Sequence, residues 1–503
     1  MFLPRQAHWA SCVLAFTLVS WNMCGAVAQT VNPPTSLSIE ERLAAQEAEL
    51  RQLRLELAEQ AKIIRRLPPV TGIQQAVNLE AKDAAGSEPK ETIEQRFDAF
   101  EKDWHDFKEK QKKEKEEAHG KPQVMVYGQV QGDFVSFNQD EVSRESVGDL
   151  QDGADFRRAR IGARGKMFDV YEYTCQVDFA LDGRPSFLDL YLEHRDLPFL
   201  KHARIGHFFE PFSLERVTQN RNNTFMERSL VDTFAPARNM GVMTFGHTED
   251  ELNTWQIGTF RTNSDNNGND SFDSGQALTM RGTWLPFWDE ESGGRYYLHL
   301  GAAYSFRDAY RESVRFRQNP ELRLEQPNSG GSNFAPIFVD TGPIPAHHFQ
   351  IFDSEVALIW GSLSVQSEFA FASVDQAGGP DLFFDAEMVQ VSYFLTGEHR
   401  PYNRYMGIHD RVIPFTNFFR VRTQDQGIQM GCGAWEVAAR YSWINLTNKN
   451  IQGNDLQDFT VGLNWYLNPY TRMKFNYVRA FLDDPTTGRS TTNLFGMRFD
   501  YDF

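Results

Sequence analysis

The chain is 503 residues long, yet it has no run of 18 or more consecutive apolar residues. A helix needs about 20 such residues to cross a bilayer, so a bundle of membrane-spanning helices is excluded. Cysteine is also scarce, with four in the chain. Cys12 and Cys24 lie in a predicted targeting segment, which leaves Cys175 and Cys432. Two cysteines do not form a disulfide framework, and with no CxxC motif or Cys/His cluster we expect neither a metal site nor a cofactor.

Positive charge is in deficit. The chain has 51 basic and 68 acidic residues, a net charge of −17, which argues against non-specific binding of nucleic acid. Aromatic residues, in contrast, make up 13% of the chain and include 41 phenylalanines. A soluble protein would have to bury these rings, whereas a membrane β-barrel turns many of them outward to lipid.

Residues 1–28 have the pattern of a signal peptide. Arg5 supplies the positive charge, residues 12–20 form a short apolar core, and residues 26–28 read Ala-Val-Ala, a small-residue cleavage site. A short membrane anchor is the alternative. The segment predicts export, and with the features below it predicts the outer membrane of a Gram-negative type of cell.

Residues 29–67 are predicted to contain a coiled-coil helix. Apolar residues recur in alternating steps of four and three, which is a heptad pattern with its core at Leu43, Leu50, Leu57 and Ile64. Residues 68–122 are predicted to be a linker and a second, charged amphipathic helix whose aromatic seam includes Trp104. We expect this arm to lie in the periplasm. It could pair with other subunits or fold back on its own chain.

Residues 123–503 alternate between apolar and polar positions, as β-strands do. On the last strand, Phe495, Phe499 and Tyr501 share one side, while Arg498 and Asp500 share the other. Such strands suit a soluble sandwich or a membrane barrel. The signal peptide, the aromatic residues at strand ends and the terminal Phe503 favour an all-β transmembrane barrel of about 16 antiparallel strands in a lipid bilayer.

One predicted strand carries a row of cations. In residues 156–168, Arg158, Arg160, Arg164 and Lys166 fall on the phase opposite to the apolar residues, which places them in the lumen. Successive guanidiniums along a pore wall can bind phosphate or carboxylate groups. Alternatively, acids on neighbouring strands neutralise the row. The available acids are Glu172, Asp178, Asp189 and Glu193.

Several blocks of sequence, taken in order, resemble the phosphate-selective porin O and P family. They are FRRARIGARG (156–165), GHFFEPFSLERVTQNRNNTFMERSL (206–230), SYFLTGEHRPY (392–402), GAWEVAARYSWINL (433–446) and VGLNWYLNPYTRMKFNYVRA (461–480). The resemblance spans about residues 123–503 and leaves out the helical arm. It implies a homotrimer of 16-stranded barrels, each with an anion pore.

The resemblance also implies positions for the anion site. Family arginines match Arg157, Arg158 and Arg228, a basic residue matches Arg216, an aspartate matches Asp189, and Arg160 replaces a tyrosine. Gln219 and Asn220 replace two serines, and their amides can still donate hydrogen bonds. Together with the cation row, the predicted anion-binding or pore-lining residues are Arg157, Arg158, Arg160, Arg164, Asp189, Arg216, Gln219, Asn220 and Arg228.

The leading functional prediction is a passive channel for inorganic phosphate or other small anions. The alternatives are an unselective porin and a structural tether between the barrel and the periplasm or cell wall. An enzyme is not expected, because the chain has no GxSxG motif and no histidine-rich cluster. Arg498, on the terminal strand, is expected to lie far from the arginine row and to contribute little to selectivity.

Overall fold

The computed structural model describes residues 102, 104–106, 108–110, 121–180, 185–262, 275–324, 337–422 and 427–503. The predicted signal peptide, the heptad segment and most of residues 68–122 lie outside the described residues. Residues 102, 104–106 and 108–110 of the second predicted helix are helical. In the described part of the chain, no helix has the length and apolar character needed to cross a membrane.

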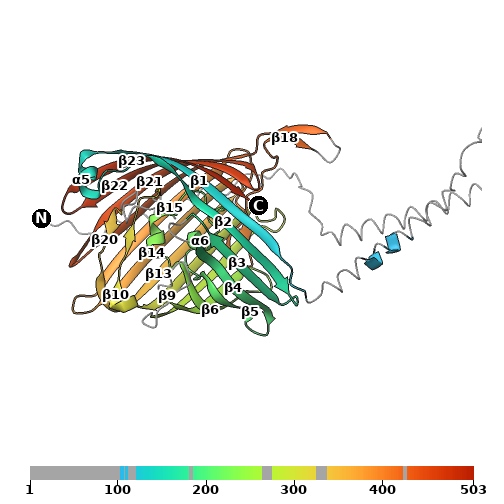
Figure 1. Ribbon diagram of the computed structural model, residues 1–503, viewed down its shortest axis with the longest axis horizontal. Helices are drawn as coiled ribbons and strands as arrows, with labels where there is room; N and C mark the ends of the chain where they lie inside the picture. The colour runs from blue at the N-terminus through green and yellow to red at the C-terminus, as the bar shows by residue number, and fades with distance from the viewer. Residues whose placement is uncertain are drawn as a thin grey trace, which may run out of the picture. The chain divides into compact units, whose positions relative to one another are not determined.

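Sixteen antiparallel strands close into a barrel (Figure 1). Each strand pairs with its neighbour in the chain, and the last strand pairs with the first, Val130 lying opposite Tyr501. The prediction of about 16 strands is confirmed. The barrel strands are β1 (Met125–Gln139), β2 (Gly153–Met167), β3 (Tyr171–Asp178), β4 (Ser186–Leu197), β5 (Lys201–Phe209), β6 (Arg238–His247), β7 (Asn253–Arg261), β8 (Gln276–Trp288), β9 (Tyr296–Asp308), β13 (Ile344–Trp360), β14 (Leu363–Gln376), β15 (Leu382–Phe394), β20 (Ala434–Asn448), β21 (Ile451–Asn468), β22 (Thr471–Asp484) and β23 (Gly488–Asp502).

The alternation along the strands separates an outer apolar surface from an inner polar one. On β23, Phe495 and Phe499 are exposed on the outside, whereas Arg498, Asp500 and Asp502 are fully buried on the inside. The same holds on β20, where Val437 and Tyr441 face outward and Glu436 and Arg440 face inward. The outer surface therefore suits lipid, and the lumen receives the charged side chains.

Parts of three connecting segments lie in the lumen. The β5–β6 segment (residues 210–237) contains α6 (Leu214–Val217) and the 3-10 helix η1 (Leu230–Thr233). The β9–β13 segment (residues 309–343) contains η2 (Tyr310–Glu312), β10 (Ser313–Val314), β11 (Arg317–Gln318) and β12 (Val339–Asp340). The β15–β20 segment (residues 395–433) contains β16 (Tyr402–Asn403), β17 (Ile408–His409), β18 (Phe419–Arg422) and β19 (Ile428–Gly431). Of these strands, β18 projects outside the barrel (Figure 1). A further helix, α5 (Glu141–Val147), packs on β23.

The direction of the strands tells from which end each segment enters. β1 begins and β23 ends at the same end of the barrel, which we call the terminal end; the opposite end is the loop end. Because consecutive strands are antiparallel, the β5–β6 and β9–β13 segments enter from the loop end and the β15–β20 segment from the terminal end. The β5–β6 and β15–β20 segments meet where the backbone amide of His409 donates to the hydroxyl of Thr218 at 3.4 Å.

One side of the lumen is packed with apolar residues. Ala370, Phe384, Ile444 and Leu494 from the inner wall form a single buried cluster with residues of the β5–β6 and β9–β13 segments, among them Leu322. Burial of these side chains fixes the inserted segments against β13–β15 and β20–β23. The open space that remains therefore lies beside β1–β7.

Candidate functional site

A cavity of about 800 Å³ lies beside strands β1–β7 and is rich in positive charge. Eight cationic and two acidic side chains line it. The cations are Arg158, Arg160, Arg164, Lys166, Arg204, Arg221, Arg228 and Arg238, and the acids are Glu172 and Asp189. The cavity reaches residues 123–125, which precede or open β1, so it extends to the terminal end of the barrel.

A β-bulge in β2 brings two adjacent arginines to the inside. Gln131 of β1 pairs with Arg158 and Gly132 pairs with Phe156, so Arg157 is an extra residue inserted in β2 at this point. Regular alternation would send Arg157 and Arg158 to opposite faces. Instead both side chains are buried, at 8% and 6% exposure, while Phe156 faces outward. The family resemblance places both arginines in the predicted anion site, and the bulge is what turns both side chains to the inside.

A second bulge, in β4, directs Asp189 inward. Cys175 of β3 pairs with Leu190 and Val177 pairs with Phe187, so Leu188 and Asp189 together lie opposite a single residue. Next to this bulge, position 206 of β5 requires glycine. Gly206 has a φ of +137°, and a Cβ there would lie 2.2 Å from the carbonyl oxygen of Leu190. Asp189 thereby reaches the cavity although its neighbour Leu188 also points inward.

Five of the seven lining arginines are paired with acids. Arg221 pairs with Asp502 at 3.0 Å and Arg228 with Asp232 at 3.7 Å. The other three pairs join residues of the barrel strands. Arg160 lies 2.7 Å from Asp178 on the next strand. Arg238 donates twice to Asp189, at 3.0 and 2.8 Å. A third pair of this kind joins Arg204 to Glu193 at 2.8 Å. The predicted neutralisation of lumen cations by acids on adjacent strands is thus confirmed for part of the row.

Arg158 and Arg164 are the cations of the row that stay without an acidic partner. Among the described residues, neither has a carboxylate within 4 Å, and Arg158 donates only to the side chain of Gln131, at 2.6 Å. The Nε of Arg158 is buried and has no hydrogen-bond partner there. Arg164 lies 5.4 Å from the ring centre of Tyr127. A buried guanidinium with free donor capacity is a natural contact for an anion.

The β5–β6 segment is held against the wall by a row of side-chain donors. Each of the seven carbonyl groups from residue 221 to residue 227 accepts a hydrogen bond from a side chain. The donors, in the order of those carbonyls, are Arg472, Arg400, Lys474, Asn464, Lys474, Arg498 and Arg440. Most of these donors come from β20–β23. The cations on this side of the barrel therefore position the segment and do not line the cavity.

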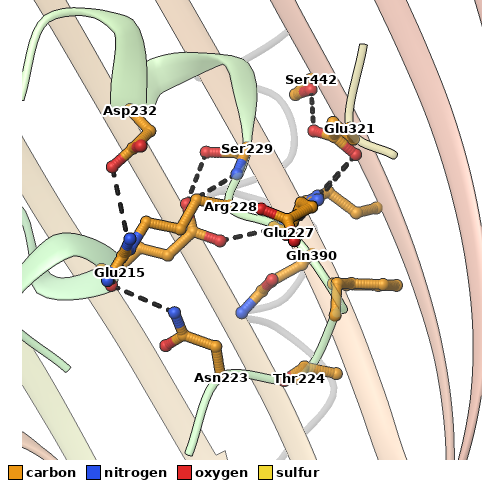
Figure 2. A network of polar contacts seen from close by, with 12 residues as sticks. Glu215, Asn223, Thr224, Glu227, Arg228, Ser229, Asp232, Glu321, Gln390 and Ser442 are labelled. Carbon is orange, nitrogen blue, oxygen red and sulfur yellow. Dashed lines mark hydrogen bonds and ion pairs between the residues drawn. The ribbon is translucent and has the colours of Figure 1, made fainter. Parts of the chain in front are cut away.

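Figure 2 shows the network around Glu215, the first-turn acid of α6. Its carboxylate accepts from the backbone and hydroxyl of Ser229 at 2.9 and 2.7 Å and pairs with Arg440 at 2.9 Å. Arg228 donates to the carbonyl oxygen of Glu215 at 3.1 Å, so one side of its guanidinium is used and another lines the cavity. Burial raises the pKa of Glu215, and Arg440 opposes this shift.

Arg216 is held by contacts within the β5–β6 segment. Its guanidinium lies 3.0 Å from Asp232 and donates to the carbonyl oxygen of Ala235 at 2.6 Å. Burial lowers the pKa of Arg216 to about 10. It is not among the residues that line the cavity, and neither is Arg157.

Glu227 joins Arg157 to the terminal strand. Its carboxylate accepts two hydrogen bonds from Arg157, both at 3.0 Å, and one from Arg498 at 2.6 Å. Burial alone would raise the pKa of Glu227, but the guanidiniums of Arg157, Arg498 and Arg158 hold it well below its usual range. The expectation that Arg498 lies far from the arginine row is therefore wrong, because closure of the barrel places β23 next to β1.

The structure brings seven of the nine predicted residues to one cavity. They are Arg158, Arg160, Arg164, Asp189, Gln219, Asn220 and Arg228. The sequence reasoning missed Arg204, Arg221 and Arg238. The alternation along the strand could have identified Arg204, because its neighbour Ile205 faces outward. Arg221 and Arg238 belong to or follow the inserted segment, where no periodic pattern applies. Within the described residues, no group of three or more His, Cys, Asp or Glu side chains is arranged to hold a metal ion.

Comparison with known proteins agrees with this architecture. The model of the family "phosphate-selective porin O and P" matches residues 124–503. The chain belongs to the phosphate-selective porin O and P family. It is therefore an outer-membrane porin, which places it among channels and not among known enzyme families.

The similar proteins and solved structures have low sequence identity to this chain. Porin O of Pseudomonas aeruginosa is 24% identical over 408 residues, which cover 75% of this chain and 87% of that protein. A loop-deletion mutant of the outer membrane protein OmpT of Vibrio cholerae is 13% identical, with coverage of 76% and 99% and a TM-score of 0.46. An anion-selective porin from Comamonas acidovorans is 11% identical, with coverage of 76% and 100% and a TM-score of 0.41.

Proposed function

We propose that the protein is a passive, anion-selective channel whose pathway is the arginine-lined cavity. The observation that carries the proposal is the excess of eight cationic over two acidic lining side chains, combined with the unpaired, buried Arg158. A wall of one sign concentrates counter-ions and excludes ions of the same sign. Several adjacent sites of moderate strength also let an ion enter and leave.

The predicted site residues offer several hydrogen-bond donors to inorganic phosphate. Arg158 and Arg228 can provide charge-assisted hydrogen bonds, and the amides of Gln219 and Asn220 line the same cavity. The Nδ2 of Asn220 is buried without a partner among the described residues, so it is available as a donor. These features support phosphate as one of the conducted anions.

An unselective porin is the second candidate. It is favoured by the ion pairs that cancel part of the positive charge of the lining. These are Arg160–Asp178, Lys166–Glu172, Arg204–Glu193, Arg221–Asp502, Arg228–Asp232 and Arg238–Asp189. The two candidates differ in the zero-current potential across a planar bilayer with a potassium chloride gradient. In an anion-selective channel the zero-current potential shifts toward the equilibrium potential of chloride. In an unselective channel it stays near zero. A value near zero, or of the potassium sign, would refute the proposal.

We further propose that the barrels assemble as a homotrimer with the N-terminal arm in the periplasm. Support comes from the family and from the position of the arm, which precedes β1 and so joins the terminal end of the barrel. In outer-membrane barrels the short turns lie on the periplasmic side. Here the terminal end carries short turns such as residues 168–170 and 361–362.

A further inference from the structure

The cavity has an apolar wall in addition to its charged one. Its lining includes the side chains of Tyr191, Phe209, Val217, Met243, Met406 and Ile408. Small hydrated anions gain no binding free energy from contact with apolar side chains. Conduction of such anions alone therefore does not explain this surface. The volume of about 800 Å³ lies in the range of cavities that hold small organic molecules.

Two residues of the apolar wall, Met406 and Ile408, come from the β15–β20 segment, and the others come from β4–β6 and α6. Met406 and Tyr191 pack on the buried cluster that contains Met243 and Phe208. The backbone carbonyl of Met406 accepts a hydrogen bond from Gln256 at 3.2 Å, and that of Gly407 accepts one from Arg281 at 2.9 Å. These bonds fix the segment, so Met406 and the half-buried Ile408 are presented to the cavity by an anchored backbone.

Charge and apolar surface lie side by side in this cavity. The guanidinium of Arg238 lies 3.8 Å from the ring centre of Phe209, and that of Arg228 lies 5.8 Å from it. Arg204 lies 4.1 Å from the ring centre of Tyr191. Stacked arginine and aromatic groups form flat surfaces on which another planar group can lie.

We propose that the cavity binds organic carboxylates with an aromatic or branched aliphatic body. The carboxylate is bound by Arg158, whose buried Nε has no partner among the described residues, and the body lies against Met406, Ile408 and Phe209. This inference rests on the proposed anion channel and names a class of anion for it. Burial of the organic body adds a hydrophobic contribution that acetate and chloride lack.

The test compares benzoate with acetate, which carries the same charged group. Full-length mature protein is reconstituted in a planar bilayer, and the block of chloride current by the potassium salt of each anion is measured at pH 7. We expect benzoate to half-block at a concentration at least about tenfold lower than acetate, since burial of the aromatic ring removes apolar surface from water. Equal half-block concentrations would overturn the inference.

A matched pair of variants locates the effect. Ile408→Asn should bring the acetate-to-benzoate ratio of half-block concentrations close to one. Ile413→Asn, in the same segment but 63% exposed and outside the cavity lining, should keep the wild-type ratio. Met406→Gln, which preserves side-chain length, serves as a second cavity variant if Ile408→Asn does not assemble. A wild-type ratio in both cavity variants would refute the assigned wall.

The two proposals fail in different ways. A zero-current potential of the potassium sign in wild-type protein refutes the anion channel itself. If the channel is chloride-selective but benzoate blocks it no better than acetate, the proposed anion channel stands. Only the proposed binding of organic carboxylates is then refuted.

Discussion

At the residue scale, the lumen cations divide into groups by what lies opposite each guanidinium. Arg440 and Arg498 pair with acids and donate to backbone carbonyls, so they hold structure in place. Arg160 pairs with one acid and still lines the cavity. Arg158 has no carboxylate within 4 Å among the described residues, so no direct ion pair competes with a passing anion for its guanidinium. We therefore expect Arg158 to have the largest effect on selectivity.

Replacing Arg158 and Arg228 together by Ala should weaken phosphate block of the chloride current. Each charge-assisted hydrogen bond contributes about 1.5–3 kcal/mol, so the loss of two raises the half-block concentration by at least about tenfold. Cations should also pass more easily, because Glu172 and Asp189 remain in the lining. The measurements are phosphate titration and zero-current potential in a planar bilayer.

The control for this double variant is Arg489→Ala. Arg489 is 87% exposed and pairs with Asp483 outside the cavity. Arg498 is unsuitable as a control because it shares Glu227 with Arg157. Unchanged phosphate block in the double variant would place the anion site elsewhere.

Glu227→Gln should destabilise the protein in a pH-dependent way. The substitution leaves Arg157 and Arg498 with less compensation, and breaking a buried pair costs about 3–5 kcal/mol. Because the folded state holds the pKa of Glu227 below its ordinary value of 4.5, the carboxylate stabilises the fold above that pH. This contribution is lost as the pH falls through the lowered pKa. The thermal unfolding temperatures of wild type and variant should therefore differ at pH 7 and converge on acidification; a constant difference would contradict the assignment.

At the scale of elements, two bulges and one anchored segment shape the cavity. The bulge in β2 turns Arg157 inward beside Arg158, and the bulge in β4 turns Asp189 inward beside Leu188. The β5–β6 segment then crosses the lumen with its carbonyl groups directed at the donors of the opposite wall. Since those donors satisfy the backbone, residues 221–227 can follow an irregular path of turns and bends inside the barrel without a sheet or helix partner.

Lys474→Met should loosen the β5–β6 segment. Lys474 donates to the carbonyl oxygens of Asn223 and Phe225, at 2.5 and 3.3 Å, and methionine fills similar space without a donor. Each buried carbonyl left unpaired costs about 1–3 kcal/mol. We expect a lower thermal unfolding temperature and larger fluctuations of the open-channel current. Arg479→Met, on the same strand but exposed on the outer face, should show neither change. A quiet, stable Lys474→Met channel would show that the other donors suffice.

At the scale of the whole molecule, the barrel is closed by the pairing of β1 with β23, and Phe503 adds the last pair of this ladder opposite Gly128. The backbone groups of Phe503 and Gly128 exchange two hydrogen bonds, at 3.2 and 3.1 Å. A Cβ on Gly128 would lie 2.4 Å from the ring of Phe503, so glycine leaves room for the terminal side chain. Closure removes the exposed strand edges that would otherwise pair with other chains.

Deleting Phe503 should lower the amount of folded protein in the outer membrane. The deletion removes both closing hydrogen bonds and the last residue of the outer apolar face of β23. Heat-modifiable protein in membrane fractions measures the folded amount. Phe199→Ala removes a 98% exposed aromatic ring from a turn at the same end and should leave the amount unchanged. An unchanged amount of folded protein after the deletion would show that Phe503 is not needed for assembly.

Deleting residues 38–67 should weaken the trimer without abolishing it. The heptad positions Leu43, Leu50, Leu57 and Ile64 favour association of helices, whereas the barrels associate through their own surfaces. Electrophoresis in mild detergent at increasing temperature should show trimers that dissociate earlier than wild type. Chloride conductance should persist, which separates a channel from a tether. A monomer under all detergent conditions, with or without the arm, would refute the trimer.

The sequence by itself determined the barrel. Alternation needs only neighbouring residues, so the inward phase of Arg158, Arg440 and Arg498 and the outward phase of Phe499 were readable from the chain. Only the tertiary structure decided which inward cations are free. Arg440 meets Glu215 and Arg498 meets Glu227 across more than 200 residues, and the bulges shift the face of Arg157 and Asp189. Whether a guanidinium can bind an anion depends on the acids around it in space, and closure of the barrel sets those neighbours.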